Sequence, residues 1–135
     1  MKLSLLTLRG LREYTFLQID KYILYGRAAM PGYIIHLCEG RYIADKLHIS
    51  KESQPELLND FLLGCVLPDA VMDKALTHFR PEWQNDLITK YPDIGHILSE
   101  YPVEAMTPAD LGILAHLMMD AAYVEEFWPQ YFQFE

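Results

Sequence analysis

The chain has 135 residues, of which 51% are hydrophobic, 13% aromatic and 22% charged. This is the composition of one globular domain with an ordinary core, and it excludes a disordered or collagen-like chain. Nineteen acidic residues against eleven basic ones give a formal net charge of -8. The acidic excess disfavours a protein that binds nucleic acid by neutralising many phosphates, so we expect no stable nucleic-acid complex.

Targeting signals are not recognisable in the sequence. The opening MKLSLLTLRG is interrupted at Arg9 and is followed by no small-residue cleavage site, so it does not resemble a signal peptide. No stretch approaches the ~18 apolar residues that a transmembrane helix needs. Cys38 and Cys65 stand in apolar stretches without metal-type spacing, which predicts buried free thiols. We therefore expect no transmembrane segment and a cytoplasmic protein.

In the first half of the chain, the apolar spacing predicts two long helices. Residues 1–29 are expected to form an N-terminal extension, in which an apolar stripe around Tyr22 favours a short helix. Apolar residues at steps of three and four predict a helix over residues 32–47, followed by a loop over 48–53. Ser53 and Glu56 have the spacing of a capping box that opens the next helix, which Pro68 should kink or end.

The second half predicts shorter helices and then one long helix. A short helix is expected between residues 70 and 79, another from 81 to 91 where Pro92 ends it, and a weaker helical segment over 94–101. Thr107, with Pro108 next and Asp110 at the third helical position, predicts a helix that runs to about Trp128. No segment shows the alternation of a strand. The expected fold is therefore all-α, a bundle of about five to six helices over residues 30–135.

Five polar residues fall where apolar helix faces are expected. Each has a structural explanation alone: a histidine within a helix can be a core residue bonded to a carbonyl, and an aspartate often ends a helix. Together, three histidines and two aspartates from four helical segments form a ligand set that zinc accepts, and helical bundles build metal sites from such inward-facing residues. The five candidate metal ligands are His36, Asp69, His78, His116 and Asp120.

The order and local context of these residues resemble the zinc-dependent phospholipase C family, whose fold is shared with the zinc-dependent single-strand nucleases. The matching segments are MPGYIIH, which ends at His36, LPD at Asp69, THF around His78, and HLMMD from His116 to Asp120. The resemblance covers about residues 31 to 132. It implies a helical domain that hydrolyses phosphodiester or phospholipid substrates with zinc and a metal-activated water.

The resemblance also implies a role for each matching residue. Asp69, His78, His116 and Asp120 would gather one zinc ion, and His36 would share a second ion with Asp120. Asp69 is the expected catalytic residue, which orients or deprotonates the attacking water.

The chain departs from the family pattern at three places. Glu126 stands where the family has a further histidine, and it is either an oxygen ligand or a solvated helix residue. The last ligand pair of the family would fall beyond Glu135, so the chain is expected to be a C-terminally truncated member. Residues 1–29 precede the apparent family start at Met30, so the amino group that secreted members use as a ligand is available only if processing or a later start exposes Pro31.

Two other functions remain open at this stage. The first is a degenerate, noncatalytic metal-binding helical module, which the missing distal ligands favour. The second is a zinc single-strand nuclease, which the acidic excess and the absence of a basic, aromatic groove disfavour. A set of aromatic residues either lines an acyl or base pocket or belongs to the core. These aromatic residues are Tyr33, Tyr123, Phe127, Trp128 and Phe132.

Overall fold

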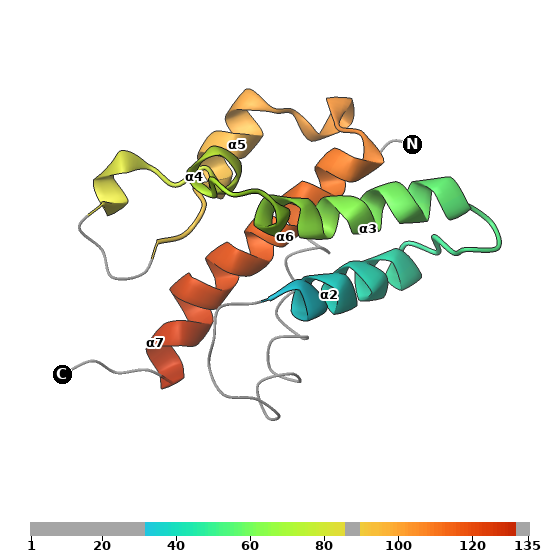
Figure 1. The fold of residues 1–135 in the computed structure, drawn as a ribbon, viewed down its shortest axis with the longest axis horizontal. Helices are drawn as coiled ribbons and strands as arrows, with labels where there is room; N and C mark the ends of the chain where they lie inside the picture. Colours follow the sequence, from blue (N-terminus) through green and yellow to red (C-terminus); the bar gives the residue numbers. More distant parts are fainter. Residues whose placement is uncertain (1–31, 86–89, 132–135) are drawn as a thin grey trace.

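The computed structural model describes residues 32–85 and 90–131. The expected N-terminal extension, residues 86–89 and Phe132 lie outside these ranges. All regular secondary structure within them is helical, which confirms the all-α prediction (Figure 1). No helix in this part of the chain has the length and apolar character needed to cross a membrane. The elements are α2 (Tyr33–Lys46), α3 (Pro55–Ala70), α4 (Ala75–His78), the 3-10 helix η1 (Glu82–Gln84), α5 (Ile94–Glu100), the 3-10 helix η2 (Val103–Ala105), α6 (Pro108–Ala122), the π-helical turn η3 (Tyr123–Phe127) and α7 (Trp128–Tyr131).

The core lies where α2, α3 and α6 meet. In Figure 1, α2 runs beside α3, and α6 crosses both obliquely. Ile43 from α2, Phe61 and Cys65 from α3, and Leu114 and Ala115 from α6 are almost completely buried in one cluster. Both cysteines are free thiols, as predicted, and Cys65 is buried while Cys38 is half-buried.

The start of α6 confirms the capping prediction. The Asp110 amide donates to Thr107 Oγ1 at 3.2 Å, and the Thr107 amide donates to Asp110 Oδ2 at 2.9 Å. Pro108 occupies the first turn, where its missing N–H costs no helical hydrogen bond. Thr107 and Asp110 thus provide hydrogen-bond acceptors for two backbone N–H groups that have no partner within the helix.

The predicted capping box at the start of α3 is wrong. This helix begins at Pro55, with Gln54 at the N-cap and no side-chain cap. The Ser53 amide instead donates to Ser50 Oγ at 3.2 Å within the preceding loop. Proline is favoured at the first helical position, so the helix starts at Pro55, one residue later than the Ser53–Glu56 spacing suggested.

Three predicted helix ends differ in the structure. Pro68 lies inside α3, which continues to Ala70, because a proline in the last turn removes few hydrogen bonds. The helix predicted to run from Thr107 to about Trp128 is α-helical only to Ala122, after which η3 begins, and Pro129 lies in the first turn of the following α7. The helix predicted over 70–79 is shorter than expected, since α4 spans Ala75–His78.

Two glycines allow α3 and α6 to approach closely. A Cβ atom placed on Gly64 would overlap the carbonyl oxygen of Ala109 on α6. One placed on Gly112 would overlap the carbonyl oxygen of Phe61 on α3. The two backbones therefore touch where they cross, and no larger residue fits at either position.

We expect Gly112→Ala and Gly64→Ala to lower the free energy of unfolding by about 1–3 kcal/mol or more, since the added methyl must separate two backbones. Gly95→Ala on α5 is the matched control, because its Cβ would meet only Asp93 Oδ1 at 3.5 Å. That change should stay within about 1 kcal/mol of the wild type. Urea denaturation measures all three, and wild-type stability of Gly112→Ala would contradict the close crossing.

Candidate metal centre

The five residues singled out in the sequence lie together at the junction of four helices. His36 comes from α2, Asp69 from the end of α3, His78 from the end of α4, and His116 and Asp120 from α6. The three histidines are 0–1% exposed and Asp120 is 4% exposed, whereas Asp69 is half-buried at the rim. Such burial of ionisable groups requires partners or a bound ion.

Asp120 is at the centre of this cluster. Its Oδ1 lies 3.4 Å from His36 Nε2, and its Oδ2 lies 3.4 Å from His78 Nε2 and 3.5 Å from His116 Nε2. Asp69 Oδ1 approaches the same His78 Nε2 at 3.5 Å. The two carboxylates thus face all three imidazoles.

The cluster contains two overlapping groups that could hold a metal ion. One consists of His36, Asp69 and His116, and the other of His78, His116 and Asp120. Within each group the ligand atoms lie within 4.8 Å of one another. Because His116 belongs to both groups, the two candidate positions are adjacent.

Hydrogen bonds to backbone carbonyls fix the tautomers of two histidines. His116 Nδ1 lies 2.8 Å from the Cys65 carbonyl oxygen, and His78 Nδ1 lies 3.1 Å from that of Lys74. A carbonyl oxygen only accepts, so each Nδ1 carries a proton, and in the neutral imidazole Nε2 then presents its lone pair to the cluster. Metal-binding histidines are commonly oriented in this way. His116 Nε2 is buried without a hydrogen-bond partner in the described structure.

The imidazole rings also pack against one another. The rings of His36 and His116 stack with centroids 3.6 Å apart and planes inclined by 20°. His78 meets His116 edge to face at 5.4 Å. These contacts restrain the rotation of all three rings, which gives the cluster a defined shape.

The pKa values show how the cluster balances its charge. Burial lowers the pKa of His36, but the Asp120 and Glu39 carboxylates outweigh it and raise this pKa to about 9. Burial raises the pKa of Asp120, but His116 and His36 outweigh it and hold this pKa well below its usual range. Burial lowers the pKa of His78. The metal-free cluster at neutral pH therefore contains a His36 cation beside an Asp120 anion.

Two residues that the sequence analysis did not single out also belong to this site. Glu39 is 1% exposed, and its Oε2 lies 3.9 Å from His36 Nδ1. Glu39 lies three residues after His36 on an apolar helix, and this i,i+3 spacing could have identified it in the sequence as a neighbour of His36. Lys74 Nζ donates to Asp69 Oδ1 at 2.7 Å. That contact depends on the turn between α3 and α4, which no sequence pattern indicated.

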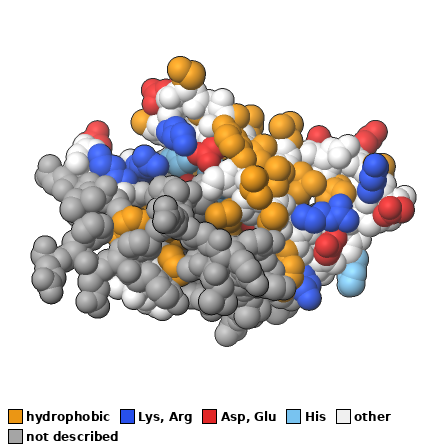
Figure 2. Space-filling view, turned by 60° about the horizontal axis from the view of Figure 1, so that its bottom comes forward, with side chains coloured by type: hydrophobic (Ala, Val, Ile, Leu, Met, Phe, Trp, Pro, Cys, Tyr) orange, Lys and Arg blue, Asp and Glu red, His pale blue; other side chains and the backbone are white. Residues whose placement is uncertain are grey.

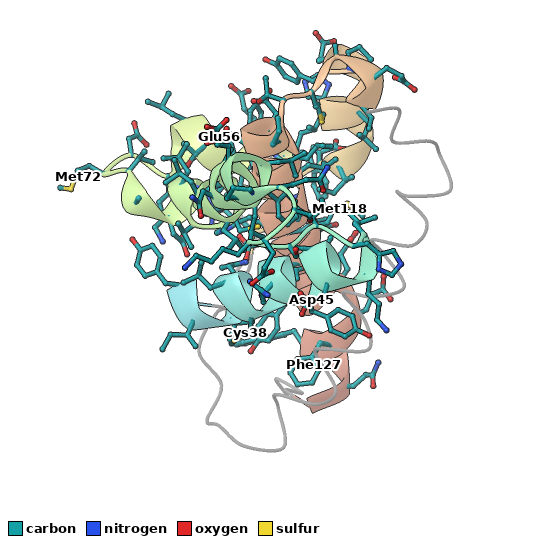
Figure 3. The ribbon with its side chains drawn as sticks, turned by 90° about the vertical axis from the view of Figure 1, so that its right-hand side faces the viewer. Cys38, Asp45, Glu56, Met72, Met118 and Phe127 are labelled. Atoms are coloured by element: carbon teal, nitrogen blue, oxygen red, sulfur yellow. The ribbon has the colours of Figure 1, made fainter. Side chains whose placement is uncertain are left out.

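Of the other sequence candidates, Tyr33 contacts the cluster through its hydroxyl, which donates to the Asp69 backbone carbonyl at 2.7 Å, and none of the others belongs to a ligand group. Glu126 is half-buried and belongs to neither ligand group, and its backbone carbonyl accepts from Gln130 Nε2 at 2.8 Å. Tyr123 and Phe127 are buried, and their rings stack at 5.2 Å. Trp128 packs against them, so these three form a second core cluster. Figure 3 shows Phe127 beyond α2, near the end of the helical run that α6 begins.

We expect the stability of chelator-treated protein to fall by a few kcal/mol between pH 6.5 and 9. The pKa of His36 is raised from 6.5 to about 9 on folding, so its contribution is complete below pH 6.5 and is lost as the pH rises through 9. His78, whose pKa is lowered, stays neutral across this window. His36→Gln should flatten the pH profile measured by urea denaturation, whereas His96→Gln, at an exposed position, should retain it. A flat wild-type profile would exclude the His36–Asp120 ion pair.

Comparison of the chain with protein-family models, with curated proteins and with solved structures found no match. The resemblance to the zinc-dependent phospholipase C family therefore stays a prediction that rests on the short segments around the five residues. The geometry of the cluster is independent of that resemblance. It establishes buried groups of histidine and aspartate that could hold a metal ion.

Proposed function

We propose that this protein is a zinc-dependent hydrolase of phosphodiesters, of the phospholipase C type. The observation that supports it most strongly is the buried cluster itself, in which three histidine Nε2 atoms face two carboxylates. A nonpolar core tolerates such a concentration of polar groups poorly unless an ion compensates for it. The orientation of His78 and His116 by carbonyl oxygens is the arrangement typical of metal ligands.

The ligand chemistry favours zinc. Imidazole nitrogen and carboxylate oxygen are ligands that this borderline ion accepts, usually four at a time. In our proposal Asp69, His78, His116 and Asp120 hold one ion, and His36 with the other oxygen of Asp120 offers a second position. The nearby Cys65 is in neither ligand group; burial raises the pKa of its thiol, and its carbonyl oxygen accepts the hydrogen bond from His116 Nδ1.

A bound zinc ion would lower the pKa of a coordinated water toward ~7 and polarise a phosphoryl oxygen. Asp69 is the proposed catalytic residue, because it alone among the five reaches the partly exposed rim while facing His78 Nε2. Its carboxylate can orient the attacking water and accept its proton.

Cations at the rim support an anionic substrate. Lys74 is half-exposed and pairs with Asp69, and Arg80 is close enough to His78 to contribute to the lowering of its pKa. Figure 2 shows Lys and Arg side chains grouped on the described surface at the edge of the grey residues. In a chain of net charge -8, cations at this position favour a phosphate group next to the cluster.

We expect the purified protein to contain at least one zinc per chain, and chelation to lower its melting temperature because the ion binds only the folded state. His116→Ala should lose most of the zinc, whereas His96→Ala at an exposed position on α5 should keep it. Elemental analysis of the folded monomer fraction measures the ratio. Equal and near-zero zinc in all three proteins would assign His116 a packing role.

We expect the zinc-loaded protein to hydrolyse a chromogenic phosphodiester or a short-chain phospholipid. Asp69→Asn should reduce kcat by about 100-fold or more, because an amide neither accepts the proton of the water nor binds zinc well. Asp45→Asn, at an exposed position on α2 (Figure 3), is the matched control and should leave the rate unchanged.

The same assay separates the competing functions. Zinc-loaded protein that hydrolyses no ester, with Asp69→Asn indistinguishable from the wild type, would identify a noncatalytic metal-binding module. Faster cleavage of single-stranded DNA than of phospholipid would identify a nuclease. Either result would contradict the proposed phospholipase C activity.

A further inference from the structure

A cavity of about 390 Å³ lies between the end of α3, α4, α5, η2 and α6. This volume is within the range of about 300–1,000 Å³ that is typical of small-molecule sites. Ile97, Leu114 and Leu117 are buried at its floor. Leu76 and Tyr101 are exposed, at 77% and 54%, so they mark its mouth. The cavity is therefore an open, apolar recess.

The polar side chains of Asp110 and Thr77 in its lining already have partners. Asp110 accepts hydrogen bonds from the amide and the hydroxyl of Thr107 in the α6 cap. Thr77 Oγ1 lies 3.0 Å from the Pro68 carbonyl oxygen, to which it donates. An occupant of the inner part must accordingly gain its affinity from apolar contact, which is what an aliphatic chain provides.

The cavity shares a wall with the candidate metal centre. Pro68, Thr77 and Leu117 line the cavity, and each is followed or preceded directly in the sequence by one of the candidate ligands. Successive helical residues are turned by about 100°, so on α6 Leu117 faces the cavity while His116 faces the cluster. The hydrogen bond between Thr77 and Pro68 joins α3 to α4 within this wall.

We propose that this cavity binds the aliphatic chain of the substrate, while the metal centre holds its phosphodiester group. The substrate class is thus an amphiphile, an alkyl or acyl phosphodiester. This deepens the proposed function, on which the assignment of the chain to a substrate rests. The aromatic residues considered for such a pocket in the sequence do not line the cavity: Tyr33, Tyr123, Phe127 and Trp128 lie elsewhere.

The first experiment measures chain binding separately from catalysis. A homologous series of neutral n-alkanols, from butanol to decanol, is titrated calorimetrically into the protein as purified. We expect affinity to rise about fourfold per added methylene until the cavity is filled, and then to level off. Neutral alcohols carry no anionic group that would be attracted to the metal centre or to Lys74.

Substitutions at the cavity test whether the alkanol binds there. Ala105→Trp at the exposed mouth should fill the cavity and reduce alkanol affinity at least tenfold, and Leu76→Gln should weaken it with little risk to the fold. Leu63→Trp is the matched control, since Leu63 is exposed on α3 outside the cavity. Affinity that is independent of chain length, or equal in all four proteins, would overturn the proposal.

A second experiment links the cavity to the reaction. Values of kcat/KM for nitrophenyl alkyl phosphodiesters should increase with chain length in the wild type and lose that dependence in Ala105→Trp. Cavity-dependent alkanol binding without hydrolysis of any ester would preserve the chain site and overturn the proposed hydrolase. Hydrolysis of short esters without alkanol binding would preserve the proposed hydrolase and overturn the chain site.

Discussion

The contact between α3 and α6 is the constraint on which the site depends. Gly64 and Gly112 let the two backbones touch, and this brings His116 on α6 within 2.8 Å of the Cys65 carbonyl on α3. That one hydrogen bond fixes the tautomer and the direction of the central imidazole. A larger residue at either glycine would separate the helices and release the ring, so core packing and site geometry are set by the same crossing.

Burial of charge is the second constraint. The His36 cation and the Asp120 anion balance each other in a region with almost no solvent contact, and Glu39 lies within 3.9 Å of the same histidine. Removal of one member of such a group leaves an uncompensated charge, which costs more than the pair contributes. A divalent cation would replace the proton of His36, which couples metal affinity to pH.

The sequence predicted the cap of α6 and the convergence of the five polar residues, but it predicted neither the start of α3 nor the features that depend on the turns between helices. The Thr107–Asp110 cap was predicted because all its atoms lie within one turn. The proximity of the five polar residues followed from their positions on apolar helix faces, although their metal-binding role stays a prediction. The contact of Lys74 with Asp69 and the cavity under Leu76 depend on the turn after α3 and on α5 and η2, so no short spacing indicated them.

The π-helical turn η3 has a consequence for the phase of the last helical run. A π turn holds an extra residue, so the side chains beyond it are rotated relative to a continuous α-helix. Side chains on α6 and α7 therefore do not follow one continuous α-helical spacing. Glu126 lies six residues after Asp120 and within this turn, and it does not continue the face that carries His116 and Asp120. Along this run, regular α-helical spacing identifies neighbours only as far as Ala122, where the α-helical geometry of α6 ends.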